Sequence, residues 1–274
     1  MHRQFIIALA ILLFASVGLS CSFLPRRDPL TWRLVLESGA AGADRDAVIG
    51  RTVTVIERRL DDLGIRNSRV VAQGSPLNGR ILVSLPNVAD HERLKAIITA
   101  GGLLEMAAVV SPPSPSPVQT YKSKEEALIS LGDKATDNRR VLPYVERAET
   151  ITGSGSSEES WVVVEVPAIV DGGDLRNASA IQSAGGPDDY QILFSLGPEG
   201  ADKFGAWTGS HINNYLGVAL NGEVKTIAYI KSRISDQGEI TGRFTKQSAE
   251  DLALVLRSGA LPAPVKIVEE SAIR

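Results

Sequence analysis

The side chains that could perform chemistry in this sequence are few and scattered. The sequence has three histidines, His2, His91 and His211, and a single cysteine, Cys21. A metal site needs histidine, cysteine or carboxylate ligands at short spacings, and these residues have no such arrangement. Cys21 adjoins an N-terminal apolar run, so the folded body lacks a cysteine nucleophile. We therefore predict no catalytic residues, no metal site, no cofactor and no enzymatic activity.

Two acidic clusters, Asp171-Gly-Gly-Asp174 and Asp188-Asp189, are the remaining candidates for chemistry. Calcium prefers carboxylate ligands in flexible loops. Neither cluster has the spacing of a calcium-binding loop, however. We predict that both serve turns and helix caps.

The composition is that of an ordinary globular protein. Of 274 residues, 43% are hydrophobic and 22% are charged, and the net charge is −3. Such a chain can bury a core, and it lacks the clustered basic face that nucleic-acid binding requires. Aromatic residues make up only 5%, which argues against stacking platforms for bases. We predict no nucleic-acid partner.

The N-terminus is typical of a targeting segment. His2 and Arg3 precede a continuous apolar run, Phe5–Leu19, which is followed by Cys21. One interpretation is a lipoprotein signal over residues 1–21, with Cys21 lipidated and becoming the mature N-terminus. The other is an uncleaved membrane anchor, for which the run is slightly short. Under both interpretations the chain is tethered to a membrane and residues 30–274 lie outside the cytoplasm.

Residues 30–110 show the pattern of an α+β unit. Alternating or apolar runs predict strands, and apolar residues at spacings of three and four predict helices. The expected order is a strand at Thr31–Glu37, a helix with the stripe Ile49 to Leu63, strands at Arg69–Ala72 and Arg80–Leu85, a helix capped by Asp90, and a strand at Leu103–Val110. This is the order of a ferredoxin-like sandwich, which we call the base.

Residues 111–160 are predicted to be a linker and irregular region. Ser111–Pro117 contains four prolines, which exclude a helix or an interior strand. Lys124–Ser130 is expected to form a short helix, and Gly153–Ser157 a flexible loop.

A second α+β unit, the head, is predicted at residues 161–261. Its expected elements are strands at Trp161–Val166 and Tyr190–Leu196, a helix opened by Pro198, a hairpin of Leu216–Leu220 and Glu223–Ile230, a strand at Glu239–Phe244, and a capped helix that begins after Thr245. Asn221-Gly222 between apolar runs favours a type I′ turn. Phe204, Trp207 and Leu252 are interpreted as core residues. We expect residues 262–274 to complete the base.

Several stretches resemble the SecD family of bacterial protein-export factors. They are Ile81-Leu-Val-Ser-Leu-Pro-Asn-Val88, Gln191 to Phe204, Val218-Ala-Leu-Asn-Gly-Glu-Val224, Gly238-Glu-Ile-Thr-Gly-Arg-Phe244 and Leu254-Val-Leu-Arg-Ser-Gly-Ala-Leu-Pro-Ala-Pro-Val265. The resemblance implies the first periplasmic domain of that family, a ferredoxin-like base with an inserted α+β head. It does not extend to the later transmembrane helices, which would follow the point where this sequence ends.

The resemblance implies a membrane-tethered periplasmic module that assists Sec-dependent translocation. Its expected partners are emerging or unfolded polypeptide and components of the Sec channel. An alternative remains open: an envelope lipoprotein of the same fold that serves as a binding or assembly module unrelated to translocation.

The hairpin is the candidate contact site for polypeptide. A module that holds an unfolded chain can use an open strand edge or a shallow apolar groove. A hairpin offers two strands and a mobile tip, so we predict that its apolar side chains bind polypeptide: Leu216, Val218, Leu220, Val224, Ile227 and Tyr229.

Overall fold

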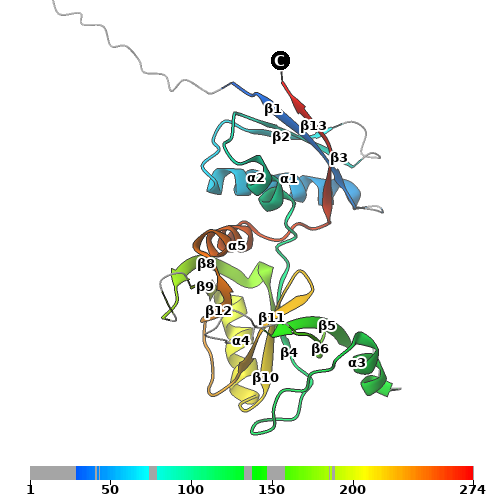
Figure 1. Ribbon diagram of the computed structural model, residues 1–274, viewed down its shortest axis with the longest axis vertical. Coiled ribbons are helices and arrows are strands. Elements are labelled where there is room, and N and C mark those ends of the chain that lie inside the picture. The colour runs from blue at the N-terminus through cyan, green and yellow to red at the C-terminus, as the bar shows by residue number, and fades with distance from the viewer. Residues whose placement is uncertain are drawn as a thin grey trace, which may run out of the picture.

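The structure is a computed structural model that describes residues 29–273, except 41, 43, 74–78, 133–137, 147–157, 185, 187 and 188. Two parts lie one above the other along its long axis (Figure 1). The base consists of β1 (Trp32–Ser38), α1 (Arg45–Asp62), β2 (Arg69–Gln73), β3 (Arg80–Leu85), α2 (His91–Thr99) and β13 (Val265–Ala272).

The head contains all the elements between α2 and β13. They are β4 (Leu104–Ala108), α3 (Lys124–Leu131), β5 (Arg139–Glu146), β6 (Glu158–Glu165), β7 (Val170–Asp171), the 3₁₀ turn η3 (Gly172–Asp174), β8 (Leu175–Gln182), β9 (Tyr190–Leu196), α4 (Pro198–Ser210), β10 (Tyr215–Leu220), β11 (Glu223–Tyr229), β12 (Gln237–Phe244) and α5 (Lys246–Ser258).

The base is an antiparallel sheet in the order β13-β1-β3-β2, with α1 and α2 on one face. One face of each strand is buried against the helices: Leu34 and Leu36 of β1, for example, are fully buried and pack with Ile56 and Leu60 of α1. The predicted α+β class is confirmed, with a ferredoxin-like base into which the head is inserted.

One strand lies elsewhere than predicted. We expected Leu103–Val110 to be the fourth strand of the base, but β4 pairs with β10 and β7 in the head, and β13 takes the fourth place in the base sheet. The reason is burial. Leu104, Met106 and Ala107 are all buried, so β4 needs a cover on both faces, whereas most of β13 is exposed, as suits an edge strand.

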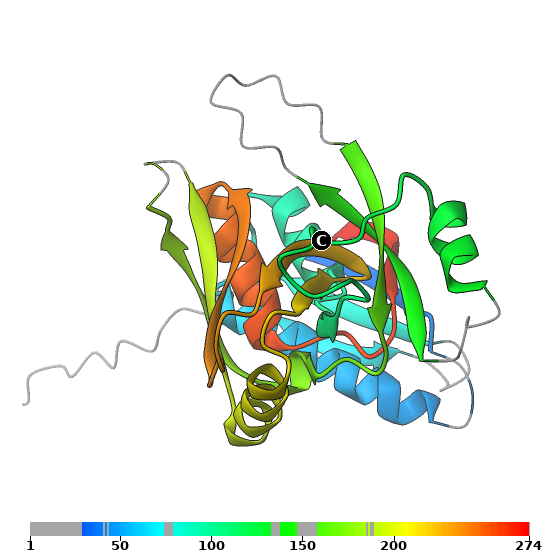
Figure 2. The same ribbon diagram turned by 90° about the horizontal axis from the view of Figure 1, so that it is seen from below.

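The head holds two sheets. The larger sheet has the order β6-β5-β11-β10-β4-β7, and the smaller has β12-β9-β8. A bridge between Val109 and Val164 joins the end of β4 to β6, so the larger sheet curls back on itself around a small apolar core. The smaller sheet packs on α5, and with α4 it encloses the second core, in which Phe194 and Phe204 are almost fully buried. Figure 2 shows α3 beside β5 and β6 at one side of the head, and the smaller sheet with α5 at the other.

The region expected to be irregular contains regular elements. Lys124–Leu131 is helical as predicted, with Ser123 as its N-cap, but β5 was not predicted. Its sequence includes Pro143, which argues against a central strand. The proline is tolerated because β5 meets β11 at a single register pair, Val224 with Tyr144, and pairs fully only with β6. The loop predicted at Gly153–Ser157 lies outside the described residues.

The hairpin turn forms as predicted. Asn221 and Gly222 have φ angles of 52° and 81°, and both lie in the left-handed region that a type I′ turn requires. β10 and β11 pair antiparallel on either side of this turn.

Candidate functional site

Half of the side chains predicted to bind polypeptide are in the core. Leu216, Val218 and Val224 are 3%, 4% and 0% exposed. The hairpin lies in the middle of the larger sheet, with β4 beside β10 and β5 beside β11, so neither strand is an open edge of that sheet. The prediction is wrong for these three residues, because side chains that fill a core cannot also contact a partner.

The other three predicted residues are less deeply buried. Leu220 and Ile227 are partly buried and pack against the two cores of the head. Tyr229 is 38% exposed; its hydroxyl donates a hydrogen bond to Asn213 Oδ1 at 2.7 Å. Of the six, only Tyr229 presents a large exposed surface.

The hairpin tip is bound to the segment that runs from the base to the head. Asn221 N–H donates to the carbonyl of Leu103 at 2.8 Å, and Leu103 N–H donates to Asn221 Oδ1 at 3.0 Å. The tip is therefore hydrogen-bonded to the residue that precedes β4, which contradicts the expectation of a mobile tip.

An open groove of about 630 Å³ lies on the head between α4 and the segment that follows β6. One face of α4 forms its first wall, because Lys203, Ala206, Trp207 and Ser210 recur at spacings of three and four. The opposite face of the helix carries Phe204 into the core. The remaining lining comes from Ala108, Asn138, Glu165, Val166, Pro167, Ala168 and Ile169.

Trp207 is the one aromatic side chain among the described residues that line this groove. It packs against the head core, in line with its interpretation as a core residue, but it is only partly buried and also lines the groove. The ring stacks on His211 at 4.4 Å between centroids and an interplanar angle of 10°, and His211 Nδ1 lies 2.8 Å from the carbonyl of Trp207. This arrangement fixes the ring, so the apolar wall is pre-formed. The spacing of the four α4 residues was the only signal in the sequence that could have revealed this wall.

The groove is mainly apolar, but its lining includes the charged residues Lys203 and Glu165. Lys203 pairs with Asp174 Oδ1 at 3.1 Å, and this hydrogen bond raises the pKa of Lys203. Asp174 also caps the turn η3, where its Oδ2 accepts from Asp171 N–H at 3.1 Å. The first acidic cluster therefore caps a turn, as predicted, and also forms an ion pair, which was not predicted. Asp188 of the second cluster lies outside the described residues.

The histidines take part in packing. His91 stacks on Trp32 in the base at 4.0 Å between ring centroids, and His211 stacks on Trp207. Within the described part of the chain, no group of three His, Cys, Asp or Glu side chains could hold a metal ion. Cys21 lies outside the described residues.

The base and the head meet at a buried arginine. Arg59 of α1 is 0% exposed, and its guanidinium donates to the carbonyls of Ile97 at 2.8 Å, Ala100 at 2.6 Å and Gly259 at 3.0 Å, and to Ser258 Oγ at 3.2 Å. These acceptors are at the C-terminal ends of α2 and α5, where helix dipoles favour a cation. Burial lowers the pKa of Arg59 to about 10, so the group remains charged at neutral pH. Arg59 therefore binds both segments of chain that connect the base with the head, the one after α2 and the one after α5.

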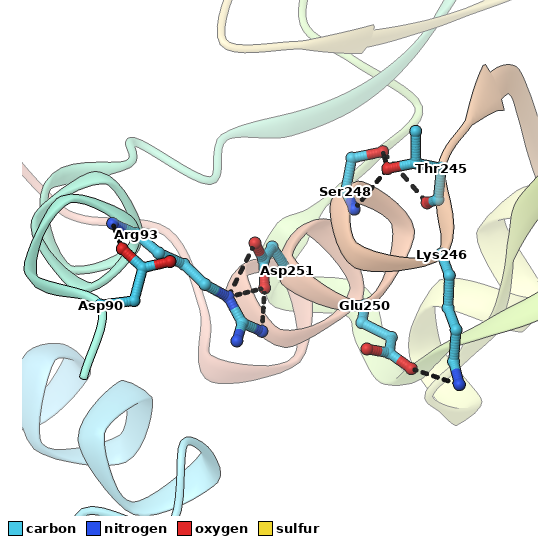
Figure 3. A network of polar contacts seen from close by, with 7 residues as sticks. All are labelled: Asp90, Arg93, Thr245, Lys246, Ser248, Glu250 and Asp251. Carbon is cyan, nitrogen blue, oxygen red and sulfur yellow. Dashed lines mark hydrogen bonds and ion pairs between the residues drawn. The ribbon is translucent and has the colours of Figure 1, made fainter. Parts of the chain in front are cut away.

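Ion pairs surround this buried contact. Arg93 of α2 donates to both carboxylate oxygens of Asp251 on α5, with the shortest contact at 2.6 Å (Figure 3). The hydrogen bond to Asp251 raises the pKa of Arg93. On the other side of α5, Arg257 pairs with Asp62 of α1 at 3.2 Å. Helix α5 is thus bound to both helices of the base.

Comparisons with known proteins identify both parts of this architecture. The family description "SecDF, P1 head subdomain" matches residues 146–263, and "Protein translocase subunit SecDF, P1 domain, N-terminal" matches residues 49–111. The chain belongs to the SecD/SecDF family. The first segment covers the head from β6 to α5, and the second covers most of α1, then β2, β3 and α2 of the base, and β4.

Similar proteins include the "Protein translocase subunit SecD" of Aquifex aeolicus, which is 34% identical over 84% of this chain and 40% of its own length. The subunit of Koribacter versatilis is 35% identical over 84% of this chain and 39% of its own length. This chain therefore spans about two fifths of those SecD proteins.

Solved structures support the same fold. A crystal structure of SecDF in a super-membrane-facing form matches with a TM-score of 0.65 and 28% identity, over 88% of this chain and 30% of that one. A second, described as a membrane component SecDF that enhances protein export, matches with a TM-score of 0.63 and 27% identity, over 88% of this chain and all of that one. In the part of our chain that the structure describes, no helix is long and apolar enough to span a membrane.

Proposed function

We propose that this chain is a membrane-tethered, non-enzymatic module of protein export that faces the periplasm and contacts emerging polypeptide through the groove beside Trp207. The observation that carries the proposal is the position of this groove: nine of its eleven lining residues belong to the segment that matches the SecDF P1 head. The relatives are protein translocase subunits, which makes translocating polypeptide the expected occupant.

The groove suits an extended chain of variable sequence. Its volume of about 630 Å³ is within the range of binding pockets, but it is open to solvent rather than enclosed. Such a shape favours shallow contact with successive side chains over recognition of one small ligand. Trp207 offers an apolar face to such a chain. Contact of this kind is weak and tolerant of sequence, as transport of many substrates requires.

The exposed ring of Tyr229 extends this candidate surface. Trp207 stacks on His211, Ile212 is 47% exposed, and Asn213 accepts the hydrogen bond from Tyr229. Tyr229 therefore lies beside the segment that follows α4. Tyr229 is the one predicted hairpin residue that remains a candidate.

Photocrosslinking in cells tests the proposal. A photoreactive residue at Ala206, which is exposed on the groove face of α4, should crosslink to nascent secreted chains, whereas the same residue at Ala47, exposed on α1 of the base, should not. A second probe is a photoreactive residue in place of Tyr229. Ala206→Glu should reduce its crosslinking to secreted chains several-fold, since a carboxylate would then project into the mainly apolar groove. Ala47→Glu is the matched control for helix and charge.

Two outcomes would contradict this function. Equal adducts at Ala206 and Ala47 would mean that contact is non-specific. Adducts only to envelope proteins outside the Sec channel would favour the alternative, a binding or assembly module unrelated to translocation.

Palmitate labelling tests the tether. Labelling that is lost in Cys21→Ser would establish a lipid tether, and membrane retention without labelling would indicate an uncleaved anchor.

A further inference from the structure

The sheet of the base has one face that no helix covers. α1 and α2 lie on the face toward the head, so the other face points away from the head (Figure 1). The strand register forms rows of side chains across it. Val35, Leu82 and Val71 make a central apolar row, and Arg33, Ser84 and Arg69 make the row nearest the start of β1.

Basic residues dominate this uncovered face. Arg33 and Arg69 are exposed, and no hydrogen bond or ion pair joins either guanidinium to another described residue. Arg80 pairs with Glu269 at 3.5 Å. The complete charged set of the face is Arg33, Arg69, Arg80 and Lys266 against Glu37 and Glu269. The face therefore carries four basic and two acidic side chains, and Arg33 and Arg69 lie in a row without an acidic residue.

The uncovered face is at the end of the molecule where β1 begins and β13 ends (Figure 1). The sequence places Arg26 and Arg27 between the apolar run and β1. Residues 22–31 reach at most about 35 Å when fully extended. A tether at Cys21, or in the apolar run before it, therefore keeps this face close to the bilayer surface.

We propose that the uncovered face of the base sheet docks on anionic lipid headgroups, with Arg33 and Arg69 as the phosphate-binding residues. This inference rests on the membrane tether in the proposed function. Guanidinium groups suit phosphate because they offer several donors in one plane. Docking holds the base against the membrane and directs the head, with its groove, away from it.

Lipid-dependent fluorescence quenching tests this docking in the full chain. A fluorophore on Gln73→Cys, which is exposed on the same face, is read against a quencher on lipid headgroups in reconstituted vesicles. Quenching should be stronger with phosphatidylglycerol than with phosphatidylcholine alone, and raised salt should reduce it. Each arginine near an anionic surface contributes about fivefold, so Arg33→Gln with Arg69→Gln should lower the docked-to-undocked ratio roughly 25-fold.

Matched variants separate docking from general charge effects. Arg51→Gln with Arg58→Gln removes two exposed charges from α1 on the opposite side of the base and should leave quenching unchanged. Arg33→Lys with Arg69→Lys keeps the charge and should retain most of the lipid dependence. A sample without Gln73→Cys measures any labelling of Cys21.

Three results would overturn the proposal. The first is equal quenching on both lipid compositions; the second is an equal loss in the two pairs of glutamine variants. The third is a fluorophore on Gln73→Cys that is shielded from solvent only in native envelope membranes, which would indicate a protein partner on this face. Failure of the chain to float with either kind of vesicle would instead remove the tether itself. Crosslinking at Ala206 reports on polypeptide contact independently of all three.

Discussion

The base and the head differ in how their sheets are covered. The base has one open sheet, one core and one face that no helix covers, and that face carries more basic than acidic residues. The head has two sheets, and the larger one curls around a core of its own, with the groove beside α4. An open sheet can offer a broad surface to a membrane, whereas a curled sheet beside a helix can offer a concave surface to a chain. The difference indicates that the two parts meet different partners.

The contact between them also differs in kind from the two cores. The cores are apolar, but the joint depends on Arg59, with ion pairs of α5 around a small cluster of Ile97, Leu254 and Val255. Polar contacts of this sort fix orientation through geometry more than they add stability. Substitutions at this contact test whether the base and the head unfold as one cooperative unit or as two.

The largest loss of stability is expected from Arg59→Leu. This change leaves buried carbonyls at the ends of α2 and α5 without donors, at a cost of about 4 kcal/mol in the free energy of unfolding. Urea unfolding followed by Trp32 in the base and by Trp207 in the head should then give two separate transitions. Arg58→Leu, a change at the exposed neighbouring position, should cost less than about 0.5 kcal/mol. Coincident transitions in Arg59→Leu would show that the apolar contacts alone couple the two parts.

A smaller loss of stability is expected from Asn221→Ala. Alanine at a φ of 52° is strained, and the bond from Leu103 N–H to the side chain is lost, so unfolding should become easier by about 2 kcal/mol. Asn221→Gly relieves the strain and loses only the bond, so about 1 kcal/mol is expected. If both variants lose the same amount, backbone strain does not contribute and the turn is not what positions the tip.

The ion pair of Arg93 and Asp251 should contribute less again. The two side chains are 36% and 23% exposed, and solvent screens a pair of this exposure. A double-mutant cycle of Arg93→Ala and Asp251→Ala should give a coupling energy below about 1 kcal/mol. A much larger coupling would mean that this pair, and not Arg59, is the main link between α2 and α5.

The smallest effect concerns acid stability of the base alone. A hydrogen bond from Lys95, aided by Trp32, lowers the pKa of Glu270 below its ordinary value of 4.5. The stabilisation is therefore present above that pH and is lost as the pH falls through the lowered pKa. Glu270→Gln should be slightly less stable than the natural protein at neutral pH, and the two should converge in acid. Thermal unfolding from pH 7 to pH 3 measures this, and a constant difference would exclude the carboxylate as its source.

Local patterns in the sequence were sufficient for much of the fold. The caps at Asp90 and Thr245 form as side-chain hydrogen bonds to Arg93 N–H and Ser248 N–H, and the Asn-Gly turn adopts its expected φ angles. These features depend on neighbouring residues, so a single sequence reveals them. β8 escaped prediction because Leu175–Gln182 is polar and lacks alternation. It becomes a strand only through pairing with β9 and contact with α5.

The candidate site was predicted poorly for a related reason. Apolar residues of the hairpin have the same pattern whether they face a partner or a core, and only the neighbours of β10 and β11 decide between the two. Trp207 is an intermediate case, since it packs against the core, as its helical spacing indicated, and also lines the groove.

The sequence by itself determined the class of fold, the helix caps, the hairpin turn, the scarcity of catalytic groups and the family resemblance, because each of these depends on residue types at short spacings. The tertiary structure alone decided that β4 pairs in the head, which apolar faces are covered, and which charges remain unpaired. Those outcomes depend on which distant segments become neighbours. The uncovered face with Arg33 and Arg69 and the groove beside Trp207 both arise in this way, from strands and helices that the order along the chain does not place together.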